Sequence, residues 1–161
     1  MNILPENKYS EVWKSLDGLS PSAAFVVTVI HMGKILSEAG DKHTFSAQGL
    51  DMDEFEALFI IEGMPGCRPT DITGNSVMQP AKITRVLDRL EKKGHIVREA
   101  GKNDRRSFTL KLTASGKTCI TDAKKAMVDG TAGIEKAVGI DTLQSVNTLL
   151  RQLMTGIGGG K

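Results

Sequence analysis

The sequence predicts a mainly α-helical fold that contains one small β-hairpin. Three observations lead to this prediction. Aromatic residues make up only 4% of the 161 residues while 40% of the chain is apolar, so the core has to be built from aliphatic side chains, which suits packed helices. Apolar residues recur at helical spacing along most of the chain. Near the middle, the alternating segment SFTLKLT follows HIVRE across a glycine-led turn, which is the pattern of a hairpin.

The N-terminal part is expected to form two helices. Apolar residues spaced i, i+3, i+4 and i+7 predict a short helix over 7–17. Ser20 is a suitable N-cap and Pro21 a suitable first-turn residue for the next helix, over 21–39. This second helix is apolar on most sides, and such a helix is buried on nearly all sides. In a chain this small, that pattern suggests that a second subunit covers part of it.

Three more helices are expected before the hairpin. The segment LDMDEFEALFIIEGMPG has acids in its first turn and predicts one helix. A short helix over 69–75 and a longer one that begins at Pro80, with Gln79 as its cap, follow from the two prolines. Gly94 ends the longer helix after about Lys93. Its predicted buried face consists of Ile83, Val86, Leu87 and Leu90.

Beyond the hairpin, the sequence predicts two helices and a flexible tail. Thr113 or Ser115 caps a helix that runs to about residue 130. Asp141 starts the last helix, which carries a stripe of leucines on one face. The final segment GIGGGK is expected to have no regular structure.

The middle of the chain is basic. Residues 68–106 hold ten Lys and Arg against five Asp and Glu, although the whole chain has a net charge of only +2. The turn of the hairpin carries Lys102, Arg105 and Arg106, and cations at a hairpin tip cannot stabilise the protein's own core. This asymmetry indicates a polyanionic partner.

A short helix, a turn, a longer basic helix and a hairpin with a cationic tip together form a winged helix-turn-helix. The longer helix has the length to lie in the major groove of DNA, and the tip can then reach the minor groove or phosphates. Asp104 is expected to brace one neighbouring arginine. For Lys82 a phosphate contact without sequence information is an alternative, and Arg89, Lys92 and Lys93 are interpreted as a solvated helix end. The expected DNA-binding residues are Gln79, Lys82, Thr84, Arg85, Arg98, Lys102, Arg105 and Arg106.

The segment ITRVLDRLEKKGHIVREAGKNDRRSFTLKLTASGK, residues 83–117, resembles the signature of the MarR family of bacterial transcriptional regulators. The matching positions are Thr84, Arg85, Asp88, Leu90, Glu91, Gly94, Arg98, Asp104, Arg105, Arg106, Leu112, Thr113 and Gly116. The likeness extends more loosely over about residues 20–154. It departs from the family in RPTDITGNSVM, where Gly74 and Asn75 are weak helix formers.

The resemblance implies a homodimeric regulator, usually a repressor, on a palindromic DNA operator. It implies one MarR-like domain over 1–161, with dimerisation helices over 1–40 and 118–155 and the winged helix-turn-helix over 50–117. The first arginine of the Asp-Arg-Arg motif, Arg105, would reach the minor groove. The alternative is a winged helix that contacts protein, such as an anti-activator, which predicts weak and salt-insensitive DNA association.

Many relatives bind small aromatic or anionic molecules, so a ligand can be expected to release the DNA. The candidate pocket residues are His31, Met32, Phe55 and Phe59, although aromatic residues at helical spacing are more often plain core. Some relatives sense oxidants through a cysteine, which makes Cys67 a candidate redox residue. An inert buried thiol is the alternative.

Other classes of function find no support in the sequence. The three histidines lie far apart and no metal-ligand spacing occurs, no catalytic constellation is present, and no cofactor is implied. The longest apolar stretch, AAFVVTVI, is far shorter than the roughly 20 residues needed to span a bilayer. No targeting segment is evident and two cysteines make no disulfide framework. The sequence therefore predicts a cytoplasmic protein without a membrane partner.

Overall fold

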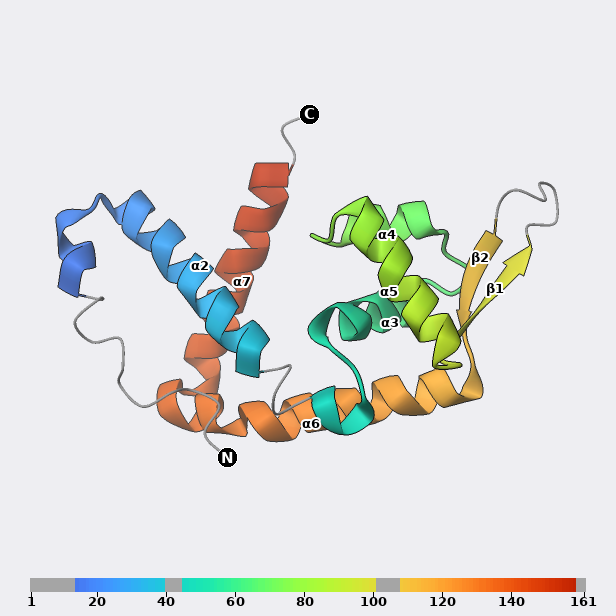
Figure 1. Cartoon of the computed structure of the whole chain (residues 1–161). Coiled ribbons are helices and arrows are strands. Elements are labelled where there is room, and N and C mark those ends of the chain that lie inside the picture. The colour runs from blue at the N-terminus through green and yellow to red at the C-terminus, as the bar shows by residue number, and fades with distance from the viewer. Residues whose placement is uncertain (1–13, 40–44, 101–107, 159–161) are drawn as a thin grey trace.

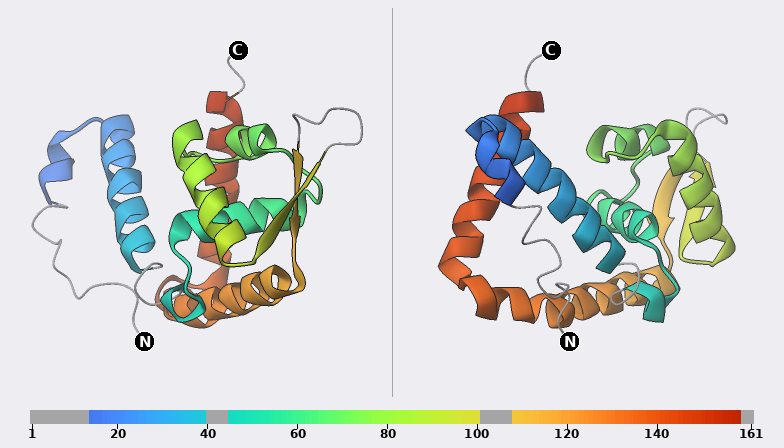
Figure 2. Two further views of the ribbon diagram at one scale, coloured as in Figure 1. Left: turned by 45° about the vertical axis from the view of Figure 1, so that its right-hand side comes forward. Right: turned by 60° about the vertical axis from the view of Figure 1, so that its left-hand side comes forward.

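The computed structural model describes residues 14–39, 45–100 and 108–158 of the chain. Figure 1 shows a winged helix on one side and two long helices, α2 and α7, on the other. Helix α6 runs beneath both parts and leads from the hairpin into α7, and in the left view of Figure 2 α7 stands behind the winged helix and apart from α2. The elements in chain order are η1 (Ser15–Gly18), α2 (Pro21–Ala39), η3 (Ser46–Gln48), α3 (Met52–Gly63), α4 (Pro69–Asn75), α5 (Pro80–Lys92), β1 (Ile96–Ala100), β2 (Phe108–Leu112), α6 (Ala114–Val138) and α7 (Ile140–Gly158).

The winged helix has the only continuous core in the described part of the chain. The predicted apolar stripe of α5 is buried, and it packs with apolar residues of α3, β1, β2 and α6. No member of that stripe is more than 2% exposed. The prediction for the buried face of α5 is therefore confirmed, and the largest side chains packed around it include Leu58, Ile61, Ile72, Ile96, Leu110 and Ile120.

The helix boundaries in this core follow the residues that predict them. Asp51 caps α3, since its carboxylate accepts a hydrogen bond from the Glu54 amide at 2.8 Å. Pro69 and Pro80 lie in the first turns of α4 and α5. Gln79 occupies the N-cap of α5, but its side chain makes no capping hydrogen bond. Gly94 ends this helix with a φ of +74°, a conformation that favours glycine.

The hairpin is antiparallel, and its register pairs Ile96 with Leu112 and Ala100 with Phe108. Alternation along β2 buries Leu110 and leaves Lys111 exposed. The tip, residues 101–107, lies outside the described residues. The predictions for Lys102, Asp104, Arg105 and Arg106 therefore stay predictions.

Two predicted helix ends were wrong, and most of the first predicted helix lies outside the described residues. Helix α6 does not stop near residue 130 but continues to Val138. Each interior glycine costs a helix only about 1 kcal/mol. The helix therefore passes through Gly130 and Gly133 and continues over residues 134–138, IEKAV. The chain breaks instead at Gly139, whose φ is +81°. Helix α7 likewise extends to Gly158, into the segment expected to lack structure.

Helices α2 and α7 carry large apolar side chains that this single chain leaves exposed. The exposed members include Phe25, Val26, Val29, Ile30, Met32 and Leu36 on α2, and Val146, Leu149, Leu153 and Met154 on α7. Between residues 14 and 158, leaving out the two gaps, no helix is long and apolar enough to cross a bilayer.

Gly116 allows α6 to start directly against the hairpin. A Cβ atom at this position would lie 2.0 Å from the backbone oxygen of His95. The same oxygen accepts a hydrogen bond from the Thr113 amide at 3.0 Å. The start of α6 is thus fixed to the start of β1 through backbone atoms, which cannot move aside as a flexible side chain would.

Replacement of Gly116 by alanine is therefore expected to destabilise the fold. We expect Gly116→Ala to lower the free energy of unfolding by about 2 kcal/mol or more, because the clash involves backbone. Urea denaturation followed by circular dichroism measures this. Gly63→Ala is the matched control, since nothing lies within 4 Å of its added Cβ. Equal stability of the two variants would contradict this reading of Gly116.

Candidate nucleic-acid interface

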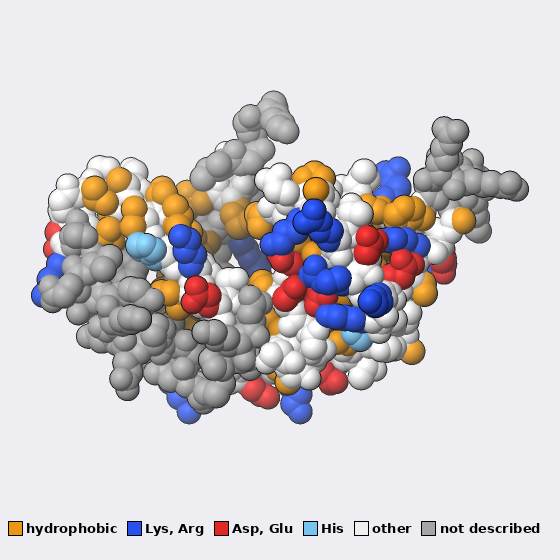
Figure 3. All heavy atoms as spheres, viewed as in Figure 1, with side chains coloured by type: hydrophobic (Ala, Val, Ile, Leu, Met, Phe, Trp, Pro, Cys, Tyr) orange, Lys and Arg blue, Asp and Glu red, His pale blue; other side chains and the backbone are white. Residues whose placement is uncertain are grey.

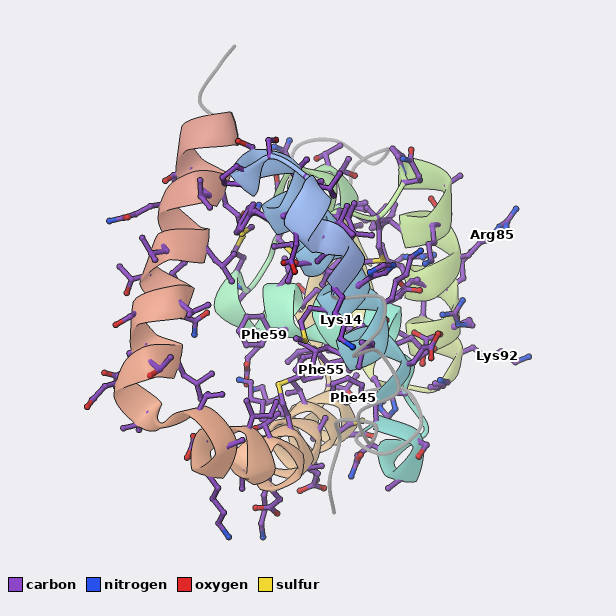
Figure 4. The ribbon with its side chains drawn as sticks, turned by 90° about the vertical axis from the view of Figure 1, so that its left-hand side faces the viewer. Lys14, Phe45, Phe55, Phe59, Arg85 and Lys92 are labelled. Carbon is purple, nitrogen blue, oxygen red and sulfur yellow. The ribbon has the colours of Figure 1, made fainter. Side chains whose placement is uncertain are left out.

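Two cations of α5 project directly away from the core. Arg85 and Lys92 lie on the face opposite the buried stripe, and Figure 4 shows both side chains pointing into solvent. They are seven residues apart, or about 10 Å along the helix axis. Among the described residues, neither has an ion-pair or hydrogen-bond partner. Both positive charges are therefore available to a ligand outside the chain.

The N-terminal end of α5 is also open. Gln79 and Thr84 are exposed, and the Thr84 hydroxyl lies 3.4 Å from the carbonyl oxygen of Pro80 in its own helix. Just before the helix, Val77 is 92% exposed, more than any other large apolar side chain among the described residues. Sequence reasoning missed Val77, because no periodic pattern marks a single apolar residue in a turn.

The other cations of α5 and of its C-cap, Lys93, form ion pairs with acids of α3 and of its N-cap, Asp51. Lys82 forms an ion pair with Asp53 at 2.7 Å. Arg89 pairs with Asp51 at 2.7 Å, and Lys93 pairs with Glu54 at 2.6 Å. Figure 3 shows the result as acidic side chains set among the basic ones over this helix.

The interpretation of the end of α5 as simply solvated therefore holds for Lys92 alone. Arg89 and Lys93 bridge two helices instead. Their partners lie more than 30 residues earlier in the chain, and helical spacing within α5 carries no information about them.

Arg98 joins the hairpin to α5. Its guanidinium lies 2.5 Å from Asp88 and 3.1 Å from Glu91, and it stacks over the Phe108 ring at 5.1 Å from the ring centre. Asp88 lies between Arg85 and Lys92 on the outward face of α5. Arg98 thus compensates an acid that would otherwise repel a polyanion, although it was expected to contact DNA itself.

The four candidate pocket residues differ in their surroundings. The Phe55 ring is buried and stacks on Phe45 at 4.4 Å, while Phe59 is 53% exposed, with the Lys124 ammonium 5.2 Å from its ring centre. Figure 4 shows Phe55 and Phe59, both from α3, with Phe45, the residue that precedes η3, next to Phe55. His31 is half-buried and Met32 is exposed on α2. A cavity of about 430 Å³ lined by Ile61, Pro65, Leu112 and other residues contains none of the four candidates.

Cys67 lies in an environment that disfavours its reactive form. The side chain is 4% exposed, and burial together with the nearby Asp71 carboxylate raises the pKa of its thiol. Because the thiolate is the form that reacts with oxidants, both effects lower its reactivity. Cys119 is buried as well, with its pKa raised by burial and by Asp122. In the described ranges, no group of three or more His, Cys, Asp or Glu could hold a metal ion.

Glu54 is the one charged side chain of the described residues that is fully buried, at 1% exposure. Burial alone would raise the pKa of its carboxyl. The hydrogen bonds from Lys93 and Arg89, with that from the Asp51 amide, outweigh burial, so the pKa lies below the ordinary value of 4.5. A lowered pKa means that the charged form of Glu54 stabilises the folded state.

Comparison with known proteins agrees with this geometry. Residues 50–108 match the model of the MarR family. The transcriptional repressor MprA of Escherichia coli is 34% identical over 89 residues, which cover 54% of this chain and 50% of MprA. The chain thus spans about half the length of this curated relative.

Two solved structures share the fold. The transcriptional repressor CouR, bound to a 23-mer DNA duplex, has a TM-score of 0.71 and 23% identity, with 78% of this chain and 89% of that chain covered. A mutant MarR from E. coli, complexed with operator DNA, has a TM-score of 0.70 and 22% identity, with 80% and 92% covered.

The lowered pKa of Glu54 predicts a pH-dependent contribution to stability. Its contribution is fully present above pH 4.5 and is lost as the pH falls through the lower folded-state pKa. We expect Glu54→Gln to cost about 2 kcal/mol near pH 6, and the difference from the wild type to shrink as the pH is lowered below 4.5. Urea denaturation of both proteins across this range measures it, and a difference that does not change with pH would contradict the assignment.

Proposed function

Because this chain belongs to the MarR family, we propose that it is a sequence-specific DNA-binding transcriptional regulator. In this proposal it is a repressor that acts in the cytoplasm as a homodimer on a palindromic operator. MprA is a transcriptional repressor, and the two structural relatives above are bound to DNA. The observation that carries the proposal is the pair Arg85 and Lys92, which face away from the core without a protein partner.

Each exposed residue of α5 suits a particular contact with DNA. Arg85 can donate two hydrogen bonds to a guanine edge, and Gln79 can pair with adenine in the same groove. Lys92, farther along the helix, suits a phosphate. Val77 can pack on a thymine methyl group, since its apolar side chain is otherwise left in water. Thr84 can donate its hydroxyl to a base or a phosphate.

The remaining predicted contacts belong to the hairpin and to Lys82. Lys82 reaches a phosphate by leaving Asp53, an exchange between two exposed anions that costs little. In the hairpin, Lys102, Arg105 and Arg106 are proposed to enter the minor groove or bind its phosphates, with Asp104 bracing one arginine. Arg98 contributes indirectly through its bonds to Asp88 and Glu91.

The exposed apolar faces of α2 and α7 support the proposed homodimer. Isolated exposed apolar residues are ordinary, but both α2 and α7 carry several large ones, and such a concentration of exposed apolar side chains marks a protein contact. A second copy would cover these faces with the same residues, as two-fold symmetry requires. Two winged helices would then bind two half-sites about one helical turn apart, or a multiple of it.

A ligand is proposed to bind beside Phe59, between α3 and the dimer helices. The exposed ring offers an apolar surface and Lys124 offers a positive charge next to it, which suits a small aromatic or anionic molecule. His31 and Met32 would close the site from α2. Binding there would favour a spacing of the two recognition helices that no longer fits the operator.

The first test concerns the two outward cations. We expect Arg85→Ala to lower operator affinity by about tenfold or more and to relax the base preference. Lys92→Ala should weaken binding to all duplexes alike and reduce the slope of log affinity against log salt by about one. Fluorescence anisotropy with a duplex selected from a random pool measures both. Lys125 is an exposed cation of α6, so Lys125→Ala is the control and should leave binding unchanged. Arg105→Ala and Arg106→Ala test the tip of the hairpin in the same assay, and each should weaken DNA binding.

Two outcomes would contradict the DNA-binding proposal. One is the failure of the wild-type protein to select any sequence from the pool. The other is duplex binding that does not respond to salt, which would favour a protein-contact module instead.

The second test concerns the homodimer. Leu149 is 59% exposed on the apolar face of α7, so Leu149→Glu would place a charge in the proposed interface, which is costly. We expect this variant to sediment as a monomer at concentrations where the wild type is a dimer. Gln144→Glu, on the polar side of the same helix, is the control. A wild-type protein that is monomeric at micromolar concentration would refute the dimer.

A further inference from the structure

Helix α5 is attached to α3 by a group of four charged side chains, which we call the Glu54 cluster. Its members are Asp51, Glu54, Arg89 and Lys93. The Glu54 carboxylate accepts hydrogen bonds from Lys93 Nζ at 2.6 and 2.8 Å and from Arg89 Nε at 3.0 Å. The same carboxylate accepts a hydrogen bond from the Asp51 amide at 3.1 Å, and this bond completes the capping box of α3.

Both cations of the cluster have a second bond to the beginning of α3. Arg89 donates to Asp51 at 2.7 Å, and Lys93 donates to the carbonyl oxygen of Gly49 at 2.6 Å. The end of α5 is therefore bonded to the segment 49–54 at three different acceptor groups, the carboxylates of Asp51 and Glu54 and the carbonyl of Gly49. Such a network defines both the rotation of α5 about its own axis and its position along that axis.

The apolar contacts of α5 define its rotation and its position along the axis less sharply than these hydrogen bonds do. Hydrophobic burial is roughly proportional to the area removed from water and has no preferred direction. Charge-assisted hydrogen bonds are short and directional. A small rotation of α5 would keep much of its apolar area buried but would break the bonds to Glu54.

We propose that Glu54 is the positioning residue of the DNA-contacting helix. By fixing the rotation of α5, it sets the direction in which Arg85 and Lys92 point. This inference rests on the proposed function, because it concerns how the protein distinguishes an operator from other DNA. The cluster also withholds Arg89 and Lys93 from phosphates, so its charges favour specific over non-specific binding.

A buried carboxylate suits this role better than an apolar residue would. Buried ion pairs contribute little net stability because desolvation of the charges opposes their attraction. Their directional bonds can nevertheless select one arrangement among several of similar stability. Glu54, inside the α3–α5 contact, is the described residue that meets this requirement.

The proposal predicts opposite changes for two classes of DNA. Glu54→Gln keeps the shape and the capping acceptor of residue 54 but removes its charge. The helix is then less well oriented for base contacts. Arg89 and Lys93 keep only their bonds to Asp51 and to the Gly49 carbonyl, and they can exchange these for a phosphate more readily than the full set of bonds. We expect operator affinity to fall and affinity for an unrelated duplex to stay equal or rise. A role in stability alone would lower both affinities by the same factor.

The experiment compares two dissociation constants for each protein at one ionic strength. The ligands are an operator duplex selected by the wild type from a random pool and a duplex of scrambled sequence. We expect the ratio of the two constants to change by about tenfold in Glu54→Gln, the equivalent of about 1.4 kcal/mol. Glu62→Gln is the matched control, since it removes an acid of α3 that pairs with Lys124 of α6 and not with α5. Its ratio should match that of the wild type.

Lys93→Met provides a second variant in case Glu54→Gln folds poorly. This variant removes the cation that donates to Glu54 and leaves the hydrogen bond from Arg89 to Glu54 in place. The ratio of its two dissociation constants should change in the same direction as that of Glu54→Gln. If the wild type selects an operator but both variants keep its ratio, Glu54 is not a positioning residue and the proposed function stands. If the wild type selects no sequence at all, the proposed function fails and this inference fails with it.

Discussion

The structure depends on one requirement, which is that α5 be buried on one face and free on the other. The apolar stripe of this helix holds it against α3, the hairpin and α6. Full burial of each such side chain contributes about 1.5–3 kcal/mol, so the stripe dominates the energy of the contact. Its direction also determines which residues are presented outward, because positions about half a turn away from the stripe have to face solvent.

Pairing within the chain then determines which outward charges are usable. Lys82, Arg89 and Lys93 lie at the edge of the buried stripe, where acids of α3 reach them. Arg85 and Lys92 lie opposite the stripe, where no acid of α3 reaches them. Counting cations along the sequence overstates the positive surface, since three of the five on α5 and its C-cap, Lys93, already have an acidic partner.

Sequence could predict what is local and could not predict what joins distant segments. The prolines and Gly94 fixed α4 and α5, and the 3.6-residue period identified the buried face, because each signal lies within the element it describes. The ion pairs of Glu54 join residues 35 and 39 positions apart, so no spacing rule could reveal them. The extent of α6 was underestimated because glycine lowers helix propensity without prohibiting a helix. Val77 could be identified only from the structure, where the large exposed fraction of its side chain distinguishes it.

The continuity of α6 links the two halves of the molecule. Its 25 residues extend about 37 Å as a single helix, with the first turn fixed to β1 through Gly116 and the last turn leading into α7. The hairpin that α6 is fixed to is bonded in turn, through Arg98, to Asp88 on the outward face of α5. The Glu54 cluster opposes rotation of α5 at its other side. The orientation of Arg85 and Lys92 is therefore set between two attachments, one to α3 and one to the hairpin that α6 carries.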